Sequence, residues 1–429
     1  FLSDVEYLDF LKLKGSYGVI GDVGTGLLNG FQLFIINQDP NGNYSFTSSS
    51  TLANPDLTWE TSNIWQIGFE STLFDGKVSV DVDYYDKRTT DLFFSENLSP
   101  SSGFTQILYN GGELQNNGLE FNINANIYSD DDFRFSVNLN GESFNNELTQ
   151  MPVSIQTGER PVFDNGLNIA AGKSQFDWYM REWAGVNPAN GEALWYQYYV
   201  DTNNNGIFEA GEPTTADGFP IDVNGDGVND NQSSTLYEYQ VLAGSGANIK
   251  KTTTNNYADA TQVFTGKSAI PDVRGGFRLN FGYKNFDVSA QFSYSFGGYV
   301  YDSGYATLMD NNLIGADNYH TDIRDAWNQP GDITDVPRVS ANYNRDGLQN
   351  AFSSRFLTRA DYFSLNNLNI GYRFPQSVLD TLKMQSFSLF LAGDNLMLLS
   401  RRDGLNPTTA IGTTNSGIYR AVLHQPQYP

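Results

Sequence analysis

The most informative stretch of the sequence is Phe286-Asp287-Val288-Ser289-Ala290-Gln291-Phe292-Ser293-Tyr294-Ser295-Phe296. Apolar side chains hold every even position and polar ones every odd position. Successive side chains of a β-strand point to opposite faces, so this stretch predicts a strand with one apolar and one polar face. The same alternation recurs in segments 78–84, 121–127, 133–140 and 367–374. Strands of this kind therefore organise the whole chain.

The length and polarity of these strands favour a membrane barrel over a soluble sandwich. Most of them extend over roughly 9 to 14 residues, enough to cross a bilayer when tilted and longer than usual globular strands. Their polar face carries Asn, Ser, Gln and Asp with little Lys or Glu, which suits a wet lumen. We expect an all-β fold, a transmembrane antiparallel β-barrel, with the soluble β-sandwich as the alternative.

The connections alternate between short and long, which orients the chain. Short links are predicted at 74–77, 129–132, 187–191 and 283–285, and long loops near 19–60, 89–116, 146–174, 201–271 and 300–355. Outer-membrane barrels have short periplasmic turns and long extracellular loops. We therefore place the short links in the periplasm and the long loops outside the cell.

Counting strands under this rule gives eleven clear ones and a weaker twelfth. They are expected near 10–18, 61–73, 77–88, 117–128, 133–145, 175–186, 192–200, 273–283, 286–299, 357–374, 386–398 and from Ile418 onward. The first runs outward and the twelfth inward, so both ends of the set lie in the periplasm. Twelve strands must close on themselves or belong to a larger barrel, because an open sheet edge is too costly in lipid.

Composition excludes several other classes of protein. The chain has 429 residues, a net charge of −24 and no cysteine. This acidity argues against a nucleic-acid partner, and the lack of cysteine excludes disulfides, thiolate metal sites and a cysteine nucleophile. A mean hydropathy of −0.41, with no uncharged apolar run of about 18 residues, excludes a helical membrane span. The chain begins with Phe1 and has no signal-peptide pattern, so we expect it to follow a cleavage or to be a fragment.

A series of motifs resembles the C-terminal barrel portion of the SusC/RagA-type TonB-dependent outer-membrane transporters of Bacteroidetes. They are Leu11-Lys12-Leu13-Lys14-Gly15-Ser16-Tyr17-Gly18, Asn54-Pro55-Asp56-Leu57-Thr58-Trp59-Glu60, Asp83-Tyr84-Tyr85, Thr90-Asp91-Leu92, Asn117-Gly118-Leu119-Glu120, Gly185-Val186-Asn187-Pro188-Ala189-Asn190-Gly191, Tyr283-Lys284-Asn285-Phe286-Asp287, Trp327-Asn328-Gln329-Pro330-Gly331-Asp332, Phe356-Leu357-Thr358-Arg359-Ala360-Asp361-Tyr362-Phe363 and Gly393-Asp394-Asn395-Leu396. Each is weak alone, but together they follow the family order over nearly the whole chain.

This resemblance implies a barrel of about 22 strands around a plugged lumen, with this chain, residues 1–429, supplying roughly the last 12. The plug, the TonB-contacting segment and the earlier strands would lie upstream. Family members usually close on one more strand with a terminal aromatic residue, whereas this chain ends at Gln425-Pro426-Gln427-Tyr428-Pro429. We therefore expect C-terminal residues to be missing.

The resemblance also implies a function, which is active outer-membrane import of an oligomeric nutrient such as a glycan or peptide. A SusD-like surface lipoprotein would cover the barrel, a TonB complex would supply energy, and lipid would surround the wall. One alternative is a SusC-like barrel that acts as a scaffold subunit of a larger complex without transport. A second is a secreted, calcium-stabilised β-sandwich that binds carbohydrate. An enzyme is not expected, because no catalytic constellation stands out in the sequence.

One pattern, within the predicted acidic loop insertion 201–271, points to metal binding. Oxygen-bearing side chains occupy positions 1, 3, 5, 9 and 12 of a calcium-type loop, with Gly206 at position 6. The predicted ligands of this first loop are Asp201, Asn203, Asn205, the carbonyl of Ile207, Glu209 and Glu212. A second copy offers Asp222, Asn224, Asp226, the carbonyl of Val228 and Asp230 but has Ser233 at position 12. Calcium is the predicted structural ion, and simple Asx turns in a solvated loop are the alternative.

Other candidate sites are weaker. Gly21, Gly24 and Gly26 lack the spacing of a dinucleotide fingerprint, and His320 and His424 have no nucleophile motif nearby. Six aromatic residues gather on one predicted hairpin, namely Trp178, Trp183, Trp195, Tyr196, Tyr198 and Tyr199. We expect them to be lipid-facing or girdle aromatics, with a stacking surface for sugar rings as the alternative.

Overall fold

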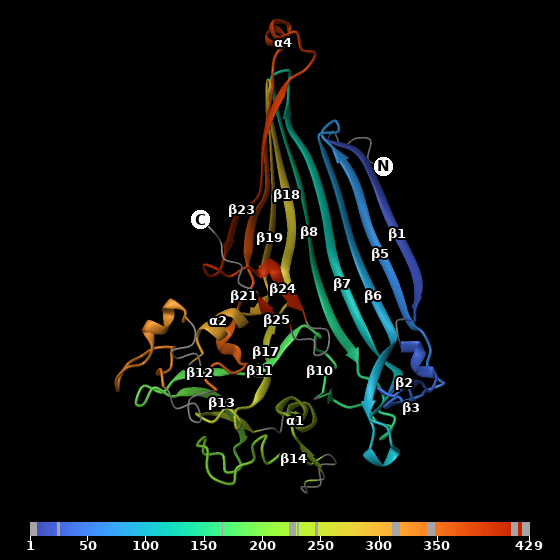
Figure 1. The fold of residues 1–429 in the computed structure, drawn as a ribbon, viewed down its shortest axis with the longest axis vertical. Coiled ribbons are helices and arrows are strands. Elements are labelled where there is room, and N and C mark those ends of the chain that lie inside the picture. Colours follow the sequence, from blue (N-terminus) through green and yellow to red (C-terminus); the bar gives the residue numbers. More distant parts are fainter. Residues whose placement is uncertain are drawn as a thin grey trace.

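The computed structural model describes residues 7–23, 26–164, 166–222, 229, 231–244, 248–310, 318–340, 348–412 and 419–422. Its main element is one sheet of ten strands, nine of which follow a single path and form a tall curved wall (Figure 1). The path runs through β1 (Leu8–Asp22), β5 (Glu60–Leu73), β6 (Val78–Asn97), β7 (Gln106–Ser129), β8 (Phe133–Gln150), β18 (Pro271–Tyr283), β19 (Phe286–Gly297), β22 (Tyr362–Arg373) and β23 (Ser388–Ser400). The tenth strand, β4 (Thr51–Leu52), pairs with β7.

The neighbouring strands of the wall are antiparallel, and the short connections lie at one end of it. Tight turns join β5 to β6, β7 to β8 and β18 to β19, and the longer link between β22 and β23 carries α4 (Gln376–Leu382). Figure 1 shows these turns and α4 together at the top and the long connections at the bottom. Three of the four predicted short links thus lie at the end of the wall opposite the long connections.

The turn between β5 and β6 shows how the sequence makes such a sharp reversal. Phe74, Asp75 and Gly76 all have positive φ values of 59°, 55° and 78°. Only glycine adopts this region without cost. The carboxylate of Asp9 accepts the backbone N–H of Gly76 at 2.9 Å, so the neighbouring strand β1 supports the strained turn.

Two insertions at the loop end form a second body, the cap. The first joins β8 to β18 and contains β9 (Phe163–Asp164), β10 (Ile169–Ala170), β11 (Asp177–Arg181), β12 (Trp183–Val186), β13 (Ala193–Val200), β14 (Phe219–Ile221), β15 (Asn231–Ser233), α1 (Leu236–Ala243), β16 (Ile249–Thr254) and β17 (Gln262–Ser268). The second joins β19 to β22 and contains β20 (Tyr299–Tyr301), α2 (Ser303–Leu308), η5 (Thr321–Asp325), η6 (Ser354–Phe356) and β21 (Leu357–Arg359).

Shorter elements complete the loop end. The connection from β1 to β5 holds η1 (Gly26–Gly30) and a hairpin of β2 (Phe34–Gln38) and β3 (Tyr44–Ser48). The connection from β6 to β7 holds η2 (Pro100–Ser102). After β23 come η7 (Pro407–Thr409), β24 (Ala410–Gly412) and β25 (Tyr419–Val422). No helix among the described residues is long and apolar enough to span a bilayer.

The fold corrects the predicted strand list in three places. The segments 175–186 and 192–200 do not join the wall, because they form β11, β12 and β13 of the cap, and the short link 187–191 lies at the loop end with them. The segment 89–116 is mostly strand, since β6 and β7 continue through it. The expected twelfth strand starts at Ile418, which lies outside the described residues, and β25 just after it pairs with β24 and β20 rather than with the wall.

Candidate functional site

The polar face of the wall is joined across its strands by side-chain hydrogen bonds. Asn138 donates to Asn124 at 2.6 Å, and Asn280 donates to Asn138 at 3.2 Å. Ser289 then donates to Asn280 at 3.0 Å. These four residues belong to β7, β8, β18 and β19, so one ladder of amides and hydroxyls crosses four strands. The odd-and-even alternation seen in the sequence thus creates a connected polar surface.

Charged side chains occupy another row of this face. Strand register places Lys14 of β1, Gly68 of β5 and Asp83 of β6 side by side. The ammonium group of Lys14 lies 2.8 Å from Asp83 and 2.5 Å from Asp81. A Cβ atom at Gly68 would collide with an Asp83 carboxylate oxygen. Glycine is therefore required here, because the ion pair passes directly over the β5 backbone.

The same row continues across three more strands. Asp83 is followed by Glu120 of β7, Glu142 of β8 and Arg274 of β18. Arg274 forms an ion pair with Glu142, just as Lys14 does with Asp83. Glu120 lies exposed between these two neutralised carboxylates and contacts no cation among the described residues. A concavity of about 470 Å³ lies beside this row. The middle of the polar face thus carries more carboxylates than cations, and Glu120 is the carboxylate of this row that pairs with no cation of the described residues.

The cap is built from two insertions that interlock. The Trp178 indole donates to the carbonyl of Tyr299 at 3.1 Å, and the Trp327 indole donates to the carbonyl of Pro188 at 3.0 Å. A buried apolar cluster also draws on both insertions, and its members are Trp178, Met180, Tyr301, Ala306, Met309, Val336, Phe356 and Leu357. The cap therefore has a hydrophobic core of its own.

Polar contacts also stabilise the junction between the two insertions. The Glu192 carboxylate lies 3.1 Å from the Arg338 guanidinium and accepts the Asn255 amide at 2.8 Å. These contacts, the Asn255 hydrogen bond most of all, hold the pKa of Glu192 below its ordinary value. Burial disfavours the charged phenolate of Tyr179 and raises the pKa of its hydroxyl to about 12. Glu192 therefore stays ionised and Tyr179 neutral near neutral pH.

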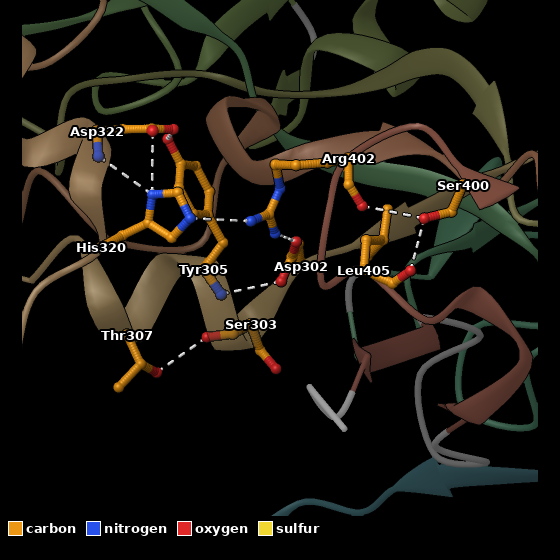
Figure 2. Close-up of polar contacts among 9 residues, drawn as sticks. All are labelled: Asp302, Ser303, Tyr305, Thr307, His320, Asp322, Ser400, Arg402 and Leu405. Atoms are coloured by element: carbon orange, nitrogen blue, oxygen red, sulfur yellow. Dashed lines mark hydrogen bonds and ion pairs between the residues drawn. The ribbon is translucent and has the colours of Figure 1, made fainter. Parts of the chain in front are cut away.

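A third junction, shown in Figure 2, ties the segment after β23 to the second insertion. The Arg402 guanidinium pairs with the buried Asp302 carboxylate and lies 4.2 Å from the centre of the Tyr305 ring. Tyr305 donates to Asp322 at 2.8 Å and packs edge-on against His320. Burial lowers the pKa of Arg402. His320 is thus part of a structural junction, and His424 lies outside the described residues.

The predicted calcium loop is a closed turn. The buried Asp201 carboxylate accepts the backbone N–H groups of Asn205 and Gly206 at 3.2 and 2.8 Å. Glu212 is also buried, and it accepts those of Thr202 and Glu209 at 3.1 and 3.0 Å. The carboxylates at positions 1 and 12 thus face backbone donors of the same loop.

The remaining predicted ligands are only partly grouped. The amides of Asn203 and Asn205 donate to Glu209 at 2.8 and 3.2 Å, and Ile207 is exposed. Within the described ranges, no three His, Cys, Asp or Glu side chains are grouped so as to hold a metal. Of the ligands predicted for the second loop, Asp222 is described, whereas Asn224, Asp226, Val228 and Asp230 lie outside the described residues.

The predicted lipid-facing role of the aromatic hairpin is wrong. Trp178, Trp195 and Tyr199 are only 1%, 2% and 1% exposed, and they lie in the cap rather than in the wall. The β11–β13 segments pair with β17 and β16 instead of with wall strands. Alternating aromatic residues mark an apolar face, but they do not show whether protein or lipid covers it.

A further surface that sequence reasoning missed lies on the β2–β3 hairpin. Its paired register puts Phe34, Ile36, Tyr44 and Phe46 on one face. Each of these side chains is between 61% and 69% exposed. The hairpin lies at the loop end beside β1 (Figure 1). Apolar side chains that gather on one exposed face are typical of an interaction surface.

Comparison with known proteins explains these features. The family model described as TonB dependent receptor-like, beta-barrel matches residues 5–219, half of the chain. The chain belongs to this TonB-dependent receptor-like β-barrel family. It is therefore an outer-membrane β-barrel protein, and the strand-rich wall confirms the predicted fold class. In barrels of this type the long connections lie outside the cell and the interior is polar, so we expect the cap outside and the polar face of the wall toward the lumen.

Two curated relatives match almost the entire chain. TonB-dependent receptor P3 of Formosa agariphila is 27% identical over 95% of this chain and 36% of its own length. TonB-dependent receptor SusC of Bacteroides thetaiotaomicron is 25% identical over 98% of this chain and 37% of its own length. The predicted resemblance to SusC/RagA-type proteins is thus confirmed. The chain spans little more than a third of these relatives.

Solved structures agree on the fold. The structure of the RagAB peptide transporter matches with a TM-score of 0.70 at 22% identity, covering 98% of this chain and 40% of that one. In the described part of the chain the wall ends at two strand edges, β1 and β23, which lipid does not tolerate. Both facts fit a partial barrel. The β-sandwich alternative is wrong, because the wall is one continuous sheet rather than two facing ones.

Proposed function

We propose that this chain forms part of the wall and the outer cap of an importer that takes up an oligomeric nutrient, a glycan or a peptide, with energy from a TonB complex. The observation that carries the proposal is the continuous polar and charged row on the lumen face, beneath a cap with its own core. The similarity to RagAB, a peptide transporter, supports a peptide as one cargo class.

The lumen row supports a specific role for Glu120. Its neighbours Asp83 and Glu142 are each paired with a cation of the wall, but Glu120 has no such pair within the described residues. An unpaired carboxylate between two neutralised ones attracts a cation from whatever fills the lumen. We propose that Glu120 holds a basic side chain of the plug that the family resemblance implies. The amide ladder around Asn138 then supplies neutral hydrogen bonds to the same plug.

The proposed partner outside the cell is a SusD-like surface lipoprotein. The apolar face formed by Phe34, Ile36, Tyr44 and Phe46 supports such a partner, because it lies beyond the wall strands and is uncovered. Replacing Ile36 and Phe46 together by Glu should weaken co-purification of the lipoprotein while the barrel still folds. Replacing the polar Asn37 and Ser45 on the opposite face by Glu is the matched control, and equal loss in both variants would contradict this surface.

The import proposal is tested by uptake in cells. Deleting the protein should abolish uptake of a labelled oligosaccharide or oligopeptide that wild-type cells import, and re-expression should restore it. Glu120→Arg should restore less uptake than wild type, whereas Glu147→Arg, also exposed on a wall strand, should restore it fully. If uptake of every tested nutrient survives deletion while an outer-membrane complex falls apart, the scaffold role replaces the transport role.

We also propose that the loop 201–212 binds calcium as a structural ion. The spacing of its oxygen ligands and the burial of Asp201 and Glu212 support this. Calcium would replace the amide bonds that Asn203 and Asn205 make to Glu209. Terbium luminescence of the detergent-solubilised protein should show a site that calcium competes for. Asp201→Asn should remove it and Asp217→Asn should not, and no binding at millimolar calcium would end the proposal.

A further inference from the structure

A ladder of aromatic rings and guanidinium groups runs through the junction of the two cap insertions. The Arg355 guanidinium lies 4.9 Å from the centre of the Trp183 ring. Trp183 packs edge-on against Trp195 at 5.8 Å, and Trp195 packs against Tyr257 at 5.4 Å. Arg181 lies 4.4 Å from the centre of the Tyr257 ring. The ladder thus has a cation at each end and three aromatic rings between them.

Buried polar atoms without partners gather around this ladder. Within the described residues, six buried side-chain polar atoms make no hydrogen bond, and four of them belong to Trp183, Trp195, Gln349 and Ser353. The side chains of Trp195, Gln349 and Ser353 are almost completely buried. Buried polar groups are nearly always satisfied in native proteins. Four such atoms at one junction of the cap mark it as a candidate site for ordered water or a polar ligand.

Backbone contacts hold these residues together. The backbone N–H of Trp183 donates to the Ser354 hydroxyl at 2.9 Å, and Arg355 donates to the carbonyl of Gln349 at 2.8 Å. Ser353 forms a β-bridge with Arg181. The ladder and the unpartnered atoms therefore belong to one site, which the second insertion supplies through residues 349–355 and the first through Arg181, Trp183 and Trp195.

The site contains two guanidinium groups, those of Arg181 and Arg355. Neither guanidinium forms an ion pair within the described residues, because Arg355 donates to the Gln349 carbonyl and Arg181 donates to the Ala260 carbonyl at 3.0 Å. Burial lowers the pKa of Arg355 to about 10, against the weaker opposing effect of the Asp335 charge, so Arg355 is still charged near neutral pH. A half-buried cation without an ion-pair partner is unusual in a chain with 49 acidic and 25 basic residues.

The chemistry of the unpartnered groups defines what would complete the site. The two indole N–H groups and the Ser353 hydroxyl are donors, and Arg355 has further N–H groups beside its bond to Gln349. These donors match a carboxylate, which accepts only. The Gln349 side-chain oxygen is an acceptor and would take an N–H or O–H group of the same molecule. The rings of Trp183 and Tyr257 are partly exposed and would contact its apolar part.

We propose that this cluster in the cap is a binding site for a solute that carries a carboxylate, with Arg355 as its counter-ion and Trp183, Trp195 and Ser353 as donors. The carboxylate could belong to a peptide C-terminus or to a uronic acid, since both present the same group. The site rests on the geometry of the cap alone. It does not depend on whether this solute, or any other, is imported.

The test measures binding to the whole purified protein in detergent by tryptophan fluorescence. The probes are an N-acetyl dipeptide as its free acid, the same dipeptide as its C-terminal amide, glucuronate and glucose. We expect saturable binding of at least one acid, and at least about tenfold weaker binding of its uncharged counterpart, the usual cost of losing a charge-assisted hydrogen bond. The acid that binds more tightly identifies the source of the carboxylate.

Matched variants keep the test specific. Arg355→Met should abolish the preference for the acid, and Arg355→Lys should retain part of it. Trp183→Phe keeps a ring but removes one donor, so it should weaken acid binding by a smaller factor. Arg160→Met is the control, because the Arg160 guanidinium also donates to a backbone carbonyl in the cap, that of Met151.

Three results would overturn the proposal. They are no saturable binding of either acid, equal binding of acid and uncharged counterpart, and unchanged acid binding in Arg355→Met. The first would mean that ordered water alone completes the cluster. Protease digestion shows whether Arg355→Met unfolds the cap. If it does, Arg355→Lys and Trp183→Phe replace it in the test. Unchanged acid binding in these two variants would also overturn the proposal. Uptake of nutrients is not part of the readout, so failure here leaves the transport proposal standing.

Discussion

The wall and the cap differ in what covers the apolar faces of their strands. In the wall, Leu13 and Leu391 are 79% and 70% exposed, while polar side chains such as Asn138 and Asn280 bond to one another across strands. In the cap, Trp178 and Met180 are fully buried and pack against residues from a second insertion. The two bodies share one chain and one alternating pattern. They differ in which solvent surrounds them.

Alternation alone therefore fixes a strand but not its surroundings. Lipid covers the apolar face of the wall, so that face needs no partner from the chain. Water surrounds the cap, so each apolar face there must be buried against another part of the protein. Mutations should consequently have different effects in the two bodies.

The largest effect is expected from Trp178→Ala in the cap. It removes the most voluminous of the fully buried side chains among the described residues, together with its hydrogen bond to the Tyr299 carbonyl. Large-to-small changes of this kind cost about 3–5 kcal/mol. Hydrogen exchange should show both insertions opening while the wall strands stay protected. Loss of protection in β6 and β7 as well would show that the cap and the wall unfold as one unit.

A charge on the lipid face should come next. Leu13→Arg places a guanidinium on the apolar face of β1 and should cost about 2–4 kcal/mol near the bilayer centre. Ile333→Arg changes an equally apolar residue of the cap that is 96% exposed. It should change the free energy of unfolding by no more than about 0.5 kcal/mol. Denaturant titration of both variants in lipid vesicles measures the contrast. Equal costs would mean that Leu13 does not face lipid.

Gly68→Val should break the charged lumen row. A side chain at Gly68 collides with Asp83 and its ion pair to Lys14, whereas a Cβ atom at Gly18, also in the wall, meets nothing within 4 Å. Overpacking of this kind costs about 1–3 kcal/mol. The thermal unfolding temperature should therefore fall for Gly68→Val and change less for Gly18→Val. A larger loss from the Gly18 change would contradict the strand register.

The smallest effect is expected from Glu192 and depends on pH. The pKa of Glu192 is lowered in the folded cap, so its ionised form stabilises the cap above the unfolded pKa. That stability is lost as the pH falls through the folded pKa. Compared with wild type, Glu192→Gln should destabilise the cap at pH 7 and show a smaller loss on acidification, measured by protease susceptibility. Identical pH profiles would show that the charge of Glu192 does not strengthen its contacts with Arg338 and Asn255.

Much of the wall could be predicted from the sequence, because local alternation and turn residues determine it. The strand expected near 286–299 is β19, which ends at Gly297, and the turn at 74–77 lies where expected. That the segment 175–200 belongs to the cap rather than to the wall could not be predicted. Whether Trp178 and Trp195 meet lipid or protein depends on β16, β17 and the second insertion, which lie more than 50 residues away.

The candidate sites were predictable to different degrees. The calcium-type spacing of Asp201 to Glu212 is local, so sequence reasoning could propose it, and its ion is still a prediction. The cap cluster could not be found this way, because Arg355 and Trp183 are 172 residues apart and meet only when the two insertions pack. The uncompensated Glu120 likewise needs the register of six strands before it stands out.

The proposed function requires the wall to cross the outer membrane with the cap outside and the short turns in the periplasm. The sequence has no cysteine, so single cysteines can be placed at Ile333 of the cap and Lys77 of a turn, both exposed. In intact cells, a membrane-impermeant maleimide should label Ile333→Cys, and it should label Lys77→Cys only after the outer membrane is permeabilised. Labelling of Lys77→Cys but not of Ile333→Cys in intact cells would contradict this orientation.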